Sequence, residues 1–433
     1  MRLLLQDIRY ACRTLVQRPG FTIVVVLTLG LGIGANTTLF SLVNAVMLKP
    51  PPIHNPEEVV ELFTSAGDGV LYGYSSYLDY RTFQAQNALF SALTAFSTLP
   101  VSIYQNDRSL RVQSPLVADN YFAVLGVPMS AGRPFRPDHG DGAETQAGVI
   151  ISYGLWQRLF GGDNNQLGQS IVVNGQSFTI IGIAPQGFSG AKRSISIDLW
   201  LPLPMEHKIS HLPFSRLDRF SRWLTIVGPL NPNIPLSQIQ ARLNVTANQL
   251  ALDYPGAWLD DQRRPRRITI LSERDTRVPM LFREATIDYV TMLSIVVVLV
   301  LLIACANVAN LIMVRTTGRH QEIAIHVALG APPRRIIRQF LTESLVLSLA
   351  AGIISLFCAI WVSDLLLAFQ PALPLPLLFK VDLDSRVLLF TGGVTLFTGL
   401  LLGLAPAFQA SVRDPSAALK DTVAGISSSV KLT

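Results

Sequence analysis

Three short stretches of the chain contain residue types that could do chemistry. Residues 30–35, GLGIGA, spell G-x-G-x-x-A, the glycine pattern of a turn that binds dinucleotides. His207 and His211 have the i, i+4 spacing of a helical metal pair. Residues 187–190, GFSG, approach the G-x-S-x-G turn of serine hydrolases. Each pattern requires particular neighbours before it can work, so the neighbours decide between chemistry and structure.

The glycine pattern lies in an apolar segment that is long enough to span a membrane. A dinucleotide turn needs an acidic residue about 20 positions later to bind the ribose, and the first acid here is Glu57. No charged residue occurs in 19–48, and about 20 apolar helical residues suffice to cross a bilayer. We therefore predict a first membrane helix (TM1) at 19–48. Gly30 and Gly34 would let another helix approach closely, which makes this face a candidate packing surface for a second copy.

The histidine and serine patterns also lack the residues that they need. The zinc-protease motif places Glu directly after the first His, where this chain has Lys208. Nearby prolines oppose a helix at the histidine pair, namely Pro202, Pro204 and Pro213. GFSG is one residue short of the nucleophile turn, so Ser189 is interpreted as a turn residue. We predict no catalytic residue and no metal site, and an enzyme acting through Ser189 or the histidines is the least favoured hypothesis.

The composition and three further charge-free runs extend the membrane prediction. Only 15% of the 433 residues are charged and 49% are hydrophobic, whereas ordinary soluble domains are about 25% charged. Charge-free runs occupy 289–314, 344–363 and 387–412, and each can cross a bilayer. The predicted membrane helices are 19–48 (TM1), 286–314 (TM2), 339–369 (TM3) and 387–412 (TM4).

Basic residues in the short segments predict the orientation. Residues 1–18 and 315–338 carry four and five arginines, each against one acid, and such segments stay cytoplasmic. The segment 49–285 and the short loop 370–386 are then outside, and 413–433 is a cytoplasmic tail. Residues 1–18 are expected to form an amphipathic helix on the inner membrane surface or on protein. The net charge of +6 therefore indicates a membrane rather than nucleic acid.

The outside segment has the pattern of a mixed α and β domain. β-rich runs flank Asn174-Gly175, a strong hairpin signal. Apolar residues at helical spacing predict a helix over 239–250, and 267–271 has the composition of a strand. The predicted fold class is an α-helical membrane protein with four transmembrane helices and a large α+β extracytoplasmic domain between the first two.

The cytoplasmic loop between the second and third spans has its own helix pattern. Residues 321–329 are expected to be helical, and Gly330 suits the left-handed position just past a helix end. Pro332 and Pro333 can then open the next helix. A short helix held between two spans is suited to docking on a partner.

Several segments together resemble a known family. EIAIHVALGA at 322–331 and RQFLTES at 338–344 resemble the permease subunits of MacB-type and FtsX-like ABC transporters. Residues 32–50, 117–135 and 404–420 resemble other parts of the same family, in the same order. The resemblance is closest to one half of the duplicated bacterial permeases of this group, which leaves two alternatives open: a stand-alone half, or part of a longer product.

The resemblance implies a layout and a contact. The layout is one span, a periplasmic MacB-like domain with a porter-like part and an insert at about 125–220, and three further spans. The helix between spans two and three contacts the ATPase, and the residues carried over to that contact are Glu322, Ile323, Ala324, His326, Ala328, Leu329, Gly330 and Ala331. Relatives commonly have an arginine at the position of His326. The contact in this chain therefore lacks the fixed positive charge of that arginine.

The implied function is that of a permease subunit in the bacterial inner membrane, with both termini cytoplasmic. It would transmit the motion of an ABC-type ATPase to the periplasmic domain for export of a drug, peptide, lipid or lipoprotein. No lysine follows a glycine in the sequence, so the phosphate loop for ATP and Mg²⁺ must belong to a partner. The chain itself is predicted not to be an enzyme and to hold no cofactor.

Other partners are expected too. These are a second copy or a paired permease half, and a periplasmic adaptor or outer-membrane channel. The alternative function is an FtsX-like signalling or scaffold protein that regulates a periplasmic cell-wall hydrolase. Asn307 and Asn310, inside the predicted TM2, are interpreted as partners in hydrogen bonds between helices.

Overall fold

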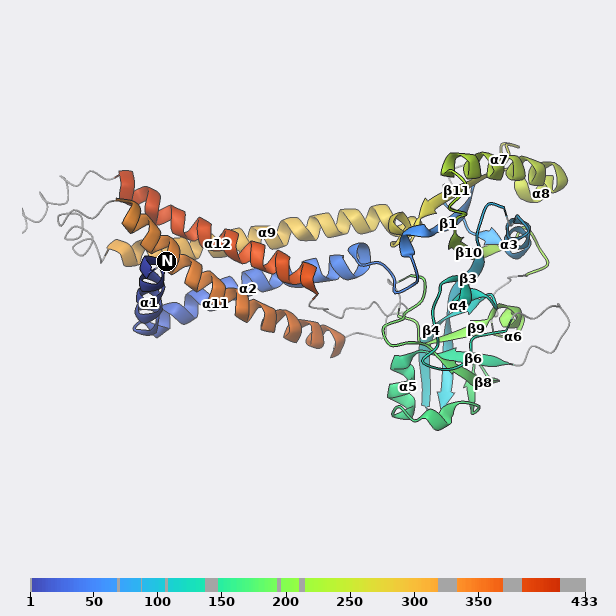
Figure 1. Ribbon diagram of the computed structural model, residues 1–433, viewed down its shortest axis with the longest axis horizontal. Helices are drawn as coiled ribbons and strands as arrows, with labels where there is room; N and C mark the ends of the chain where they lie inside the picture. The colour runs from blue at the N-terminus through green and yellow to red at the C-terminus, as the bar shows by residue number, and fades with distance from the viewer. Residues whose placement is uncertain are drawn as a thin grey trace, which may run out of the picture. The chain divides into compact units, whose positions relative to one another are not determined.

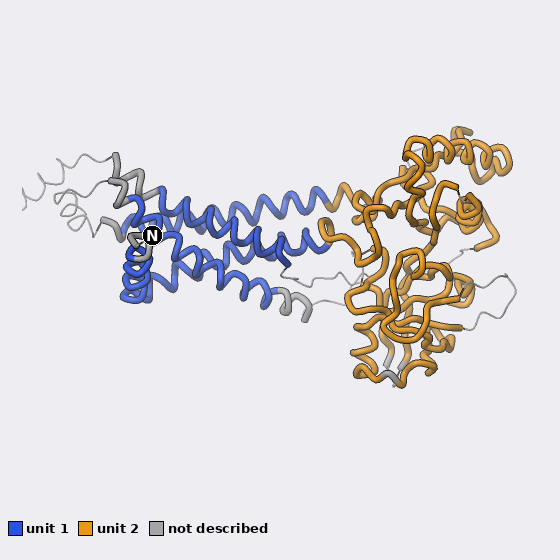
Figure 2. The backbone as a smooth tube through the Cα atoms, viewed as in Figure 1, with its two compact units in different colours: residues 1–45, 287–370, 379–433 blue, residues 46–286, 371–378 orange. Residues whose placement is uncertain are grey.

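The chain forms two compact units, which Figure 2 colours separately. We call residues 1–45, 287–370 and 379–433 the helix unit, and residues 46–286 with 371–378 the sheet unit. The computed structural model describes residues 2–67, 71–86, 88–105, 108–136, 147–192, 196–209, 215–317, 333–368 and 384–412.

The helix unit contains long apolar helices. Its described helices are α1 (Arg2–Val16), α2 (Pro19–Val43), α9 (Met280–Thr317), α11 (Pro333–Ala368) and α12 (Ser385–Val412), and α2 continues into a π-helical turn, η1 (Asn44–Leu48). Four stretches in the described residues are long and apolar enough to cross a membrane: Pro19–Leu48, Arg283–Val314, Ile337–Val362 and Ser385–Leu404. The predicted number of apolar helices is confirmed within the described residues.

A proline separates α1 from α2. Pro19 occupies the first turn of α2, where its missing N–H costs no hydrogen bond. Arg18 before it has φ −130° and ψ 68°, because the proline ring disfavours the helical conformation of the preceding residue. The chain therefore turns here instead of continuing as one helix.

The sheet unit is organised around one sheet. Its described strands are β1 (Val59–Ser65), β2 (Ser75–Ser76), β3 (Thr94–Gln105), β4 (Arg108–Val117), β5 (Ala131–Gly132), β6 (Gly148–Ile151), β7 (Ser170–Val173), β8 (Gln176–Ile183), β9 (Leu199–Pro202), β10 (Arg222–Pro229) and β11 (Arg267–Ser272). The order is β11-β1-β10-β3-β4-β9-β6-β8-β5, with β2 beside β10 and β7 beside β3 and β8. Most neighbours are antiparallel, while β4–β9 and β6–β8 are parallel.

Both faces of this sheet are covered by apolar packing. In β6, Val149 and Ile151 belong to one buried cluster and Ile150 to another, as the alternation of side chains along a strand requires. The first cluster includes the buried face of α7. The second is aromatic and includes Tyr121, Phe122 and Trp200.

Short helices connect the strands. They are η2 (Pro56–Glu58), α3 (Tyr77–Gln84), α4 (Tyr121–Val124), α5 (Tyr153–Phe160), η3 (Asn164–Gln166), η4 (Leu203–Met205), α6 (Glu206–Ile209), α7 (Leu236–Asp253), α8 (Pro255–Trp258) and η5 (Glu273–Thr276). In Figure 1, α3 and α8 lie in the same part of the sheet unit as β10 and β11.

Several predictions from local patterns are confirmed. Asn174 and Gly175 form the two-residue turn of a hairpin, with Val173 opposite Gln176 and φ values of 47° and 79°. The helix predicted over 239–250 is part of α7, and the strand predicted over 267–271 is β11. These elements follow from nearest-neighbour preferences and needed no knowledge of the tertiary structure.

The strands β5, β6, β8 and β9, from the segment 125–220, lie together beyond β4, but they continue the same sheet within one compact unit. The expectation that prolines prevent a helix at His207 is wrong, because α6 covers it. Pro202 is the residue just before η4, and Pro204 lies in the first turn of η4, where proline is tolerated.

Candidate functional site

The predicted ATPase contact, 322–331, lies outside the described residues, but both of its flanks are described. Helix α9 ends at Thr317 and α11 begins at Pro333. A proline therefore opens the helix after the contact, as the sequence suggests. The flanks are the two helices through which any movement of the contact would enter the helix unit.

An ion pair fastens α1 to the beginning of α11. Arg338 Nε lies 2.8 Å from Asp7 Oδ2, and the two side chains are 37% and 19% exposed. On the same face of α1, Ala11 and Leu15 are buried, at 2% and 7% exposure. The N-terminal helix is thus attached to the part of α11 that directly follows the predicted ATPase contact.

Reversing one charge of this pair should loosen α1. We expect Arg338→Glu to raise maleimide labelling of a cysteine placed at buried Ala11, in a chain that carries Cys12→Ser. The double variant Asp7→Arg/Arg338→Glu should restore protection, because it rebuilds the pair with opposite polarity. A partly exposed pair contributes only about 1 kcal/mol, so the labelling rate should rise about fivefold. Equal labelling of the single and double variants would contradict this role.

Close helix packing explains the glycines of α2. A Cβ atom added at Gly30 would lie 3.3 Å from Ile354 Cγ2, and one at Gly34 would lie 3.4 Å from the backbone oxygen of Ser355. Gly32, between them, faces α9 instead, with Leu301 Cδ1 at 3.2 Å. The run LGLGIG therefore lets α2 lie against α11 on one side and α9 on the other.

This packing corrects one prediction. Gly30 and Gly34 do pack against a helix, but that helix is α11 of the same chain, and both glycines are buried. The face is therefore not available to a second copy. The sequence pattern identified close packing correctly, because only the absence of side chains matters for it, but could not say which helix approaches.

Polar side chains bond α2 to its neighbours at several depths. The Thr37 and Thr391 hydroxyl groups are 3.0 Å apart, joining α2 to α12. The Asn36 amide donates to the Val297 carbonyl of α9 at 3.2 Å. Near the end of the span, the Asn44 amide donates to Asp384 at 2.8 Å. Since interhelical hydrogen bonds in an apolar setting contribute to helix association, these bonds hold α2 against α9 and α12.

Within the sheet unit, one arginine holds the entering and leaving chain together. Arg277 forms ion pairs with Glu273 in η5, through Nε at 3.1 Å. Its Nη1 also donates to the backbone oxygen of Met47 at 3.3 Å and to that of Leu48. The end of η1 and the segment just before α9 therefore meet at a single joint, which we call the Arg277 joint.

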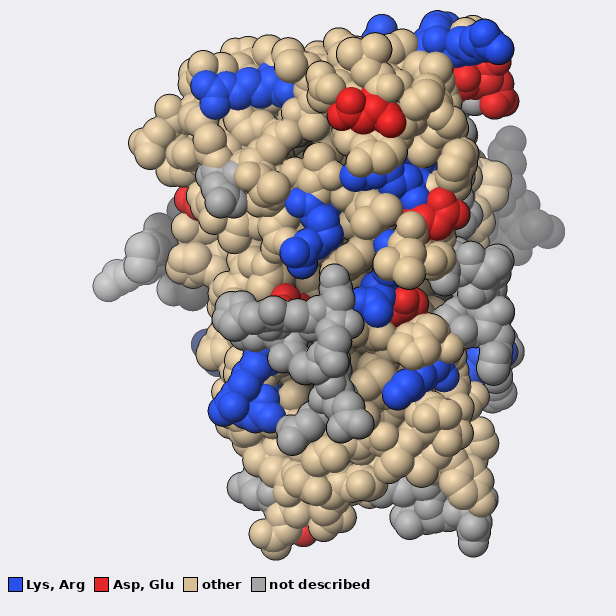
Figure 3. Space-filling view, turned by 90° about the vertical axis from the view of Figure 1, so that its right-hand side faces the viewer, with Lys and Arg blue, Asp and Glu red and all other residues tan. Residues whose placement is uncertain are grey.

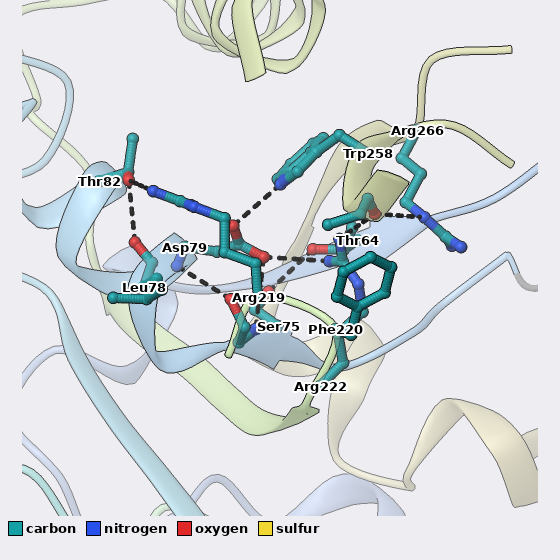
Figure 4. A network of polar contacts seen from close by, with 12 residues as sticks. Thr64, Ser75, Leu78, Asp79, Thr82, Arg219, Phe220, Arg222, Trp258 and Arg266 are labelled. Carbon is teal, nitrogen blue, oxygen red and sulfur yellow. Dashed lines mark hydrogen bonds and ion pairs between the residues drawn. The ribbon is translucent and has the colours of Figure 1, made fainter. Parts of the chain in front are cut away.

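A second polar cluster in the sheet unit, around Asp79, is drawn in Figure 4. Asp79 is fully buried and accepts from Arg219 at 2.7 Å, Arg222 at 3.1 Å and the Trp258 indole N–H at 2.9 Å. It also closes a capping box with Ser76 at the start of α3. The carboxylate thereby joins α3, the beginning of β10 and α8.

The two arginines are further held by their other groups. Arg219 donates to Thr82 and lies over the Tyr254 ring at 4.2 Å, and Arg222 lies over Trp258 at 5.2 Å. Burial lowers the pKa of the Arg222 guanidinium, and the Asp79 carboxylate opposes this shift. Every polar group of Asp79 is therefore used in holding the fold, which leaves it no free position for acid–base chemistry.

This cluster was not predicted from the sequence. Its one local signal is Ser76-x-x-Asp79, a helix-start signature, and that signal says nothing of the arginines. The remaining patterns give no site: Ser189 follows the turn at Gly187, which has φ 83°, and His211 lies outside the described residues. Within the described residues, no three His, Cys, Asp or Glu side chains form a cluster that could hold a metal ion.

On the face of the protein drawn in Figure 3, Lys and Arg side chains stand apart, with Asp and Glu between some of them.

Comparison with known proteins gives two family matches. Residues 22–245 match the MacB-like periplasmic core domain, and residues 294–415 match the FtsX-like permease C-terminal family. Similar proteins include a macrolide export ATP-binding/permease protein MacB from Burkholderia cenocepacia, 28% identical over 312 residues, and a pyoverdine export ATP-binding/permease protein PvdT from Pseudomonas aeruginosa, 27% identical over 299 residues. These alignments include 70% and 68% of this chain, but only 40% of each relative.

Solved structures of periplasmic regions are also similar. The periplasmic region of MacB from Actinobacillus actinomycetemcomitans aligns with 55% of this chain and 94% of its own, at 14% identity and a TM-score of 0.38. The chain spans about 40% of the length of the curated relatives named above. Neither of the two matching family models describes an ATPase.

Proposed function

Because the chain belongs to the family of MacB-like and FtsX-like permeases, we propose that it is the membrane subunit of an ABC export system. Its task is to transmit the movement of an ATPase on a separate chain to the sheet unit. The observation that carries this proposal is the Arg277 joint, at which the chain leaving α2 and the chain entering α9 are held together. Two membrane helices connected in this way can deliver one movement to the domain between them.

The input side of the proposal is the segment 322–331. Its position between α9 and α11 places it next to the Asp7–Arg338 ion pair in the sequence. A shift of this segment would be passed to α11 and α1, and from α11 to α2 through the close packing at Gly30 and Gly34. Packed helices move as rigid bodies because their interiors are dense, so little of the movement would be lost.

The proposed setting follows from the family and the charge pattern. The helix unit spans the bacterial inner membrane with both termini cytoplasmic, and the sheet unit is periplasmic. Relatives are named for the export of macrolides and of pyoverdine. A drug, peptide, lipid or lipoprotein is the proposed cargo class, and a periplasmic adaptor or outer-membrane channel is a further proposed partner.

Affinity purification tests the coupling directly. The tagged protein would be isolated from its native membrane, and bound proteins identified by mass spectrometry. An ABC ATPase should co-purify with the natural sequence and fall at least about tenfold with Gly330→Pro, because proline cannot adopt the left-handed conformation expected there. Gly330→Asn is the matched control, since asparagine tolerates that conformation better than other residues with side chains.

The outcome also separates the two candidate functions. A bound adaptor or channel favours export, and a bound periplasmic hydrolase favours the FtsX-like signalling alternative. If no ATPase is recovered with the natural sequence under conditions that keep the protein monodisperse, the coupling proposal fails. Equal recovery of the ATPase with Gly330→Pro and Gly330→Asn would instead show that the ATPase contact does not depend on Gly330.

A further inference from the structure

The sheet has a narrow junction between two groups of strands. The first group is β11, β1, β10, β3 and β4, and the second is β9, β6, β8 and β5. In Figure 1, β11 lies toward the upper end of the sheet unit and β8 toward the lower end. β4 meets β9 at two residue pairs, Leu116–Leu201 and Val117–Pro202, and β7, which pairs with β8, adds two pairs with β3. A sheet joined over so short a length can turn at this junction more readily than within either group.

One lysine bridges the two groups. Lys192 lies between β8 and β9, and its Nζ atom donates to the Glu61 carboxylate in β1 and to the backbone oxygen of Thr276 in η5, the latter at 2.6 Å. These contacts span 131 and 84 residues of sequence. Through Glu273, η5 also pairs with Arg277. A single ammonium group therefore joins the second group of strands to the first group and to the Arg277 joint.

The segment that carries Lys192 is itself fixed to the core. Phe188 stacks on Trp200 in β9, with the ring centroids 5.4 Å apart. The Ala191 N–H donates to the Tyr121 hydroxyl at 2.9 Å. Both Phe188 and Ala191 belong to the aromatic cluster. Because such a cluster is densely packed, a displacement of Lys192 is passed to the aromatic cluster instead of being absorbed by a loose loop.

The ion pair suits a contact that opens and closes. The side chains of Lys192 and Glu61 are 16% and 8% exposed, and the cost of removing two charges from water nearly cancels their attraction. Such a pair adds little net stability but specifies one arrangement of its neighbours. Among the described residues, no other hydrogen bond or ion pair links 187–192 to β1 or η5. The arrangement therefore depends on this one side chain.

We propose that Lys192 is a clasp between the Arg277 joint and the second group of strands, and that its opening lets this group turn about the β4–β9 junction. With the clasp closed, the ammonium group satisfies Glu61 and the Thr276 oxygen together. A shift of η5 draws the Thr276 oxygen away, because the same element is bound to Arg277. The trigger for opening rests on the proposed function, whereas the clasp is a property of the sheet unit alone.

Hydrogen exchange of the full chain in detergent tests the clasp. Lys192→Met should speed amide exchange in 187–192 and 273–276 at least about tenfold, the effect of losing a hydrogen bond made by a charged group. Lys192→Arg should keep both segments protected, because a guanidinium group can donate to the same two acceptors. Natural exchange rates in Lys192→Met, in both segments, would overturn the proposal.

A charge swap separates the ion pair from the contact with η5. Glu61→Lys/Lys192→Glu rebuilds the ion pair, but a carboxylate cannot donate to the Thr276 oxygen. Protection should therefore return in 187–192 while 273–276 still exchanges fast. Full protection of 273–276 in the swapped variant would show that the ion pair acts without the Thr276 contact, and the clasp to η5 would be wrong.

Arg158→Met is the matched control. It also removes a basic partner from a shielded carboxylate, that of Asp198, which is 12% exposed. This ion pair lies within the segment 125–220 and makes no contact with β1 or η5 among the described residues. Exchange in 187–192 and 273–276 should stay within about twofold of the natural rate, as expected for an independent site. A tenfold rise would mean that any destabilisation opens these segments, which would overturn the clasp.

Spin labels on the two sides of the junction test the turning. The three cysteines would first be replaced (Cys12→Ser, Cys305→Ala, Cys358→Ala). Val245→Cys then carries one label on α7, which Gln240 bonds to the Ile268 oxygen of β11, and Ser177→Cys carries the other on β8. Both positions are exposed. Double electron–electron resonance should give one narrow distance for this chain, and the same distance when Arg158→Met is added.

Two variants should each lose that narrow distance. Lys192→Met opens the clasp directly, and Arg277→Gln frees η5 from its ion pairs with the joint. An unchanged distance with Lys192→Met would overturn the turning about β4–β9. A change with Lys192→Met but none with Arg277→Gln would overturn the connection to the Arg277 joint. None of these readouts needs the ATPase, so a failure of the Gly330→Pro experiment leaves the result on the clasp in place.

Discussion

Replacing Asp79 with alanine should destabilise the sheet unit by about 3–5 kcal/mol, since removing one partner of a buried ion pair leaves the other charge uncompensated. Asp79 is fully buried, and the side chains of Arg219 and Arg222 are 13% and 15% exposed. In the variant, both guanidinium groups lose their carboxylate partner and the Trp258 indole N–H loses its acceptor. Asp79→Asn should have a smaller effect, because the amide oxygen can still accept one or two of these bonds.

The measurement is thermal unfolding of the full chain in detergent, followed by tryptophan fluorescence. Four of the five tryptophans lie in the sheet unit, so the signal reports mainly on it. We expect the midpoint to fall by about 10 °C for a unit of this size. Asp261→Ala is the control, since Asp261 is an exposed aspartate close to α8 in the sequence. An Asp79→Ala midpoint within 2 °C or so of the control would show that the cluster adds nothing to stability.

Gly34→Leu should separate α2 from α11. A Cβ atom at this position already reaches 3.4 Å from the Ser355 backbone oxygen and 3.5 Å from Cys358 Cβ, so the rest of a leucine side chain has no space. Overpacking of this kind costs about 1–3 kcal/mol, and backbone atoms cannot move aside as a side chain can. We expect a lower midpoint of heat-induced aggregation and, if the proposed coupling is correct, less ATP-dependent movement of the sheet unit.

Two controls make the Gly34→Leu result specific. Gly34→Ala adds only the Cβ atom, and its tight contact should be offset by the better helix propensity of alanine, about 1 kcal/mol. Gly393→Leu adds the same leucine to α12 at a position with no atom within 4 Å. Size-exclusion chromatography after heating gives the midpoints. The packing account predicts a clear drop for Gly34→Leu alone, and an equal drop for Gly393→Leu would refute it.

Much of the fold could be predicted because its causes are local. Charge-free runs identified the four apolar helices, since every residue of a span must tolerate hydrocarbon. Asn174-Gly175 identified a hairpin, because those two residues adopt the left-handed conformation most readily. The periodic apolar residues of α7 likewise face the sheet for a reason visible in the sequence, namely a helical repeat of 3.6 residues.

The polar clusters could not be predicted because their members are far apart in the sequence. Asp79 meets Arg219 and Trp258 across 140 and 179 residues. The Arg277 joint links residues 229 or 230 positions apart. No periodicity or motif relates such positions, because contact between them depends on how the strands are ordered in the sheet.

The sequence by itself thus determined which segments are apolar helices, where close packing occurs and which family the chain resembles, since each depends on residue types over short ranges. Tertiary structure alone decided which surfaces are used and which remain open. In the folded chain, Gly30 and Gly34 pack against α11 of the same chain, while Asn307 and Asn310 remain exposed on α9. The physical reason is that a glycine or an asparagine specifies the kind of neighbour that it needs, while the folding of the whole chain decides which neighbour is within reach.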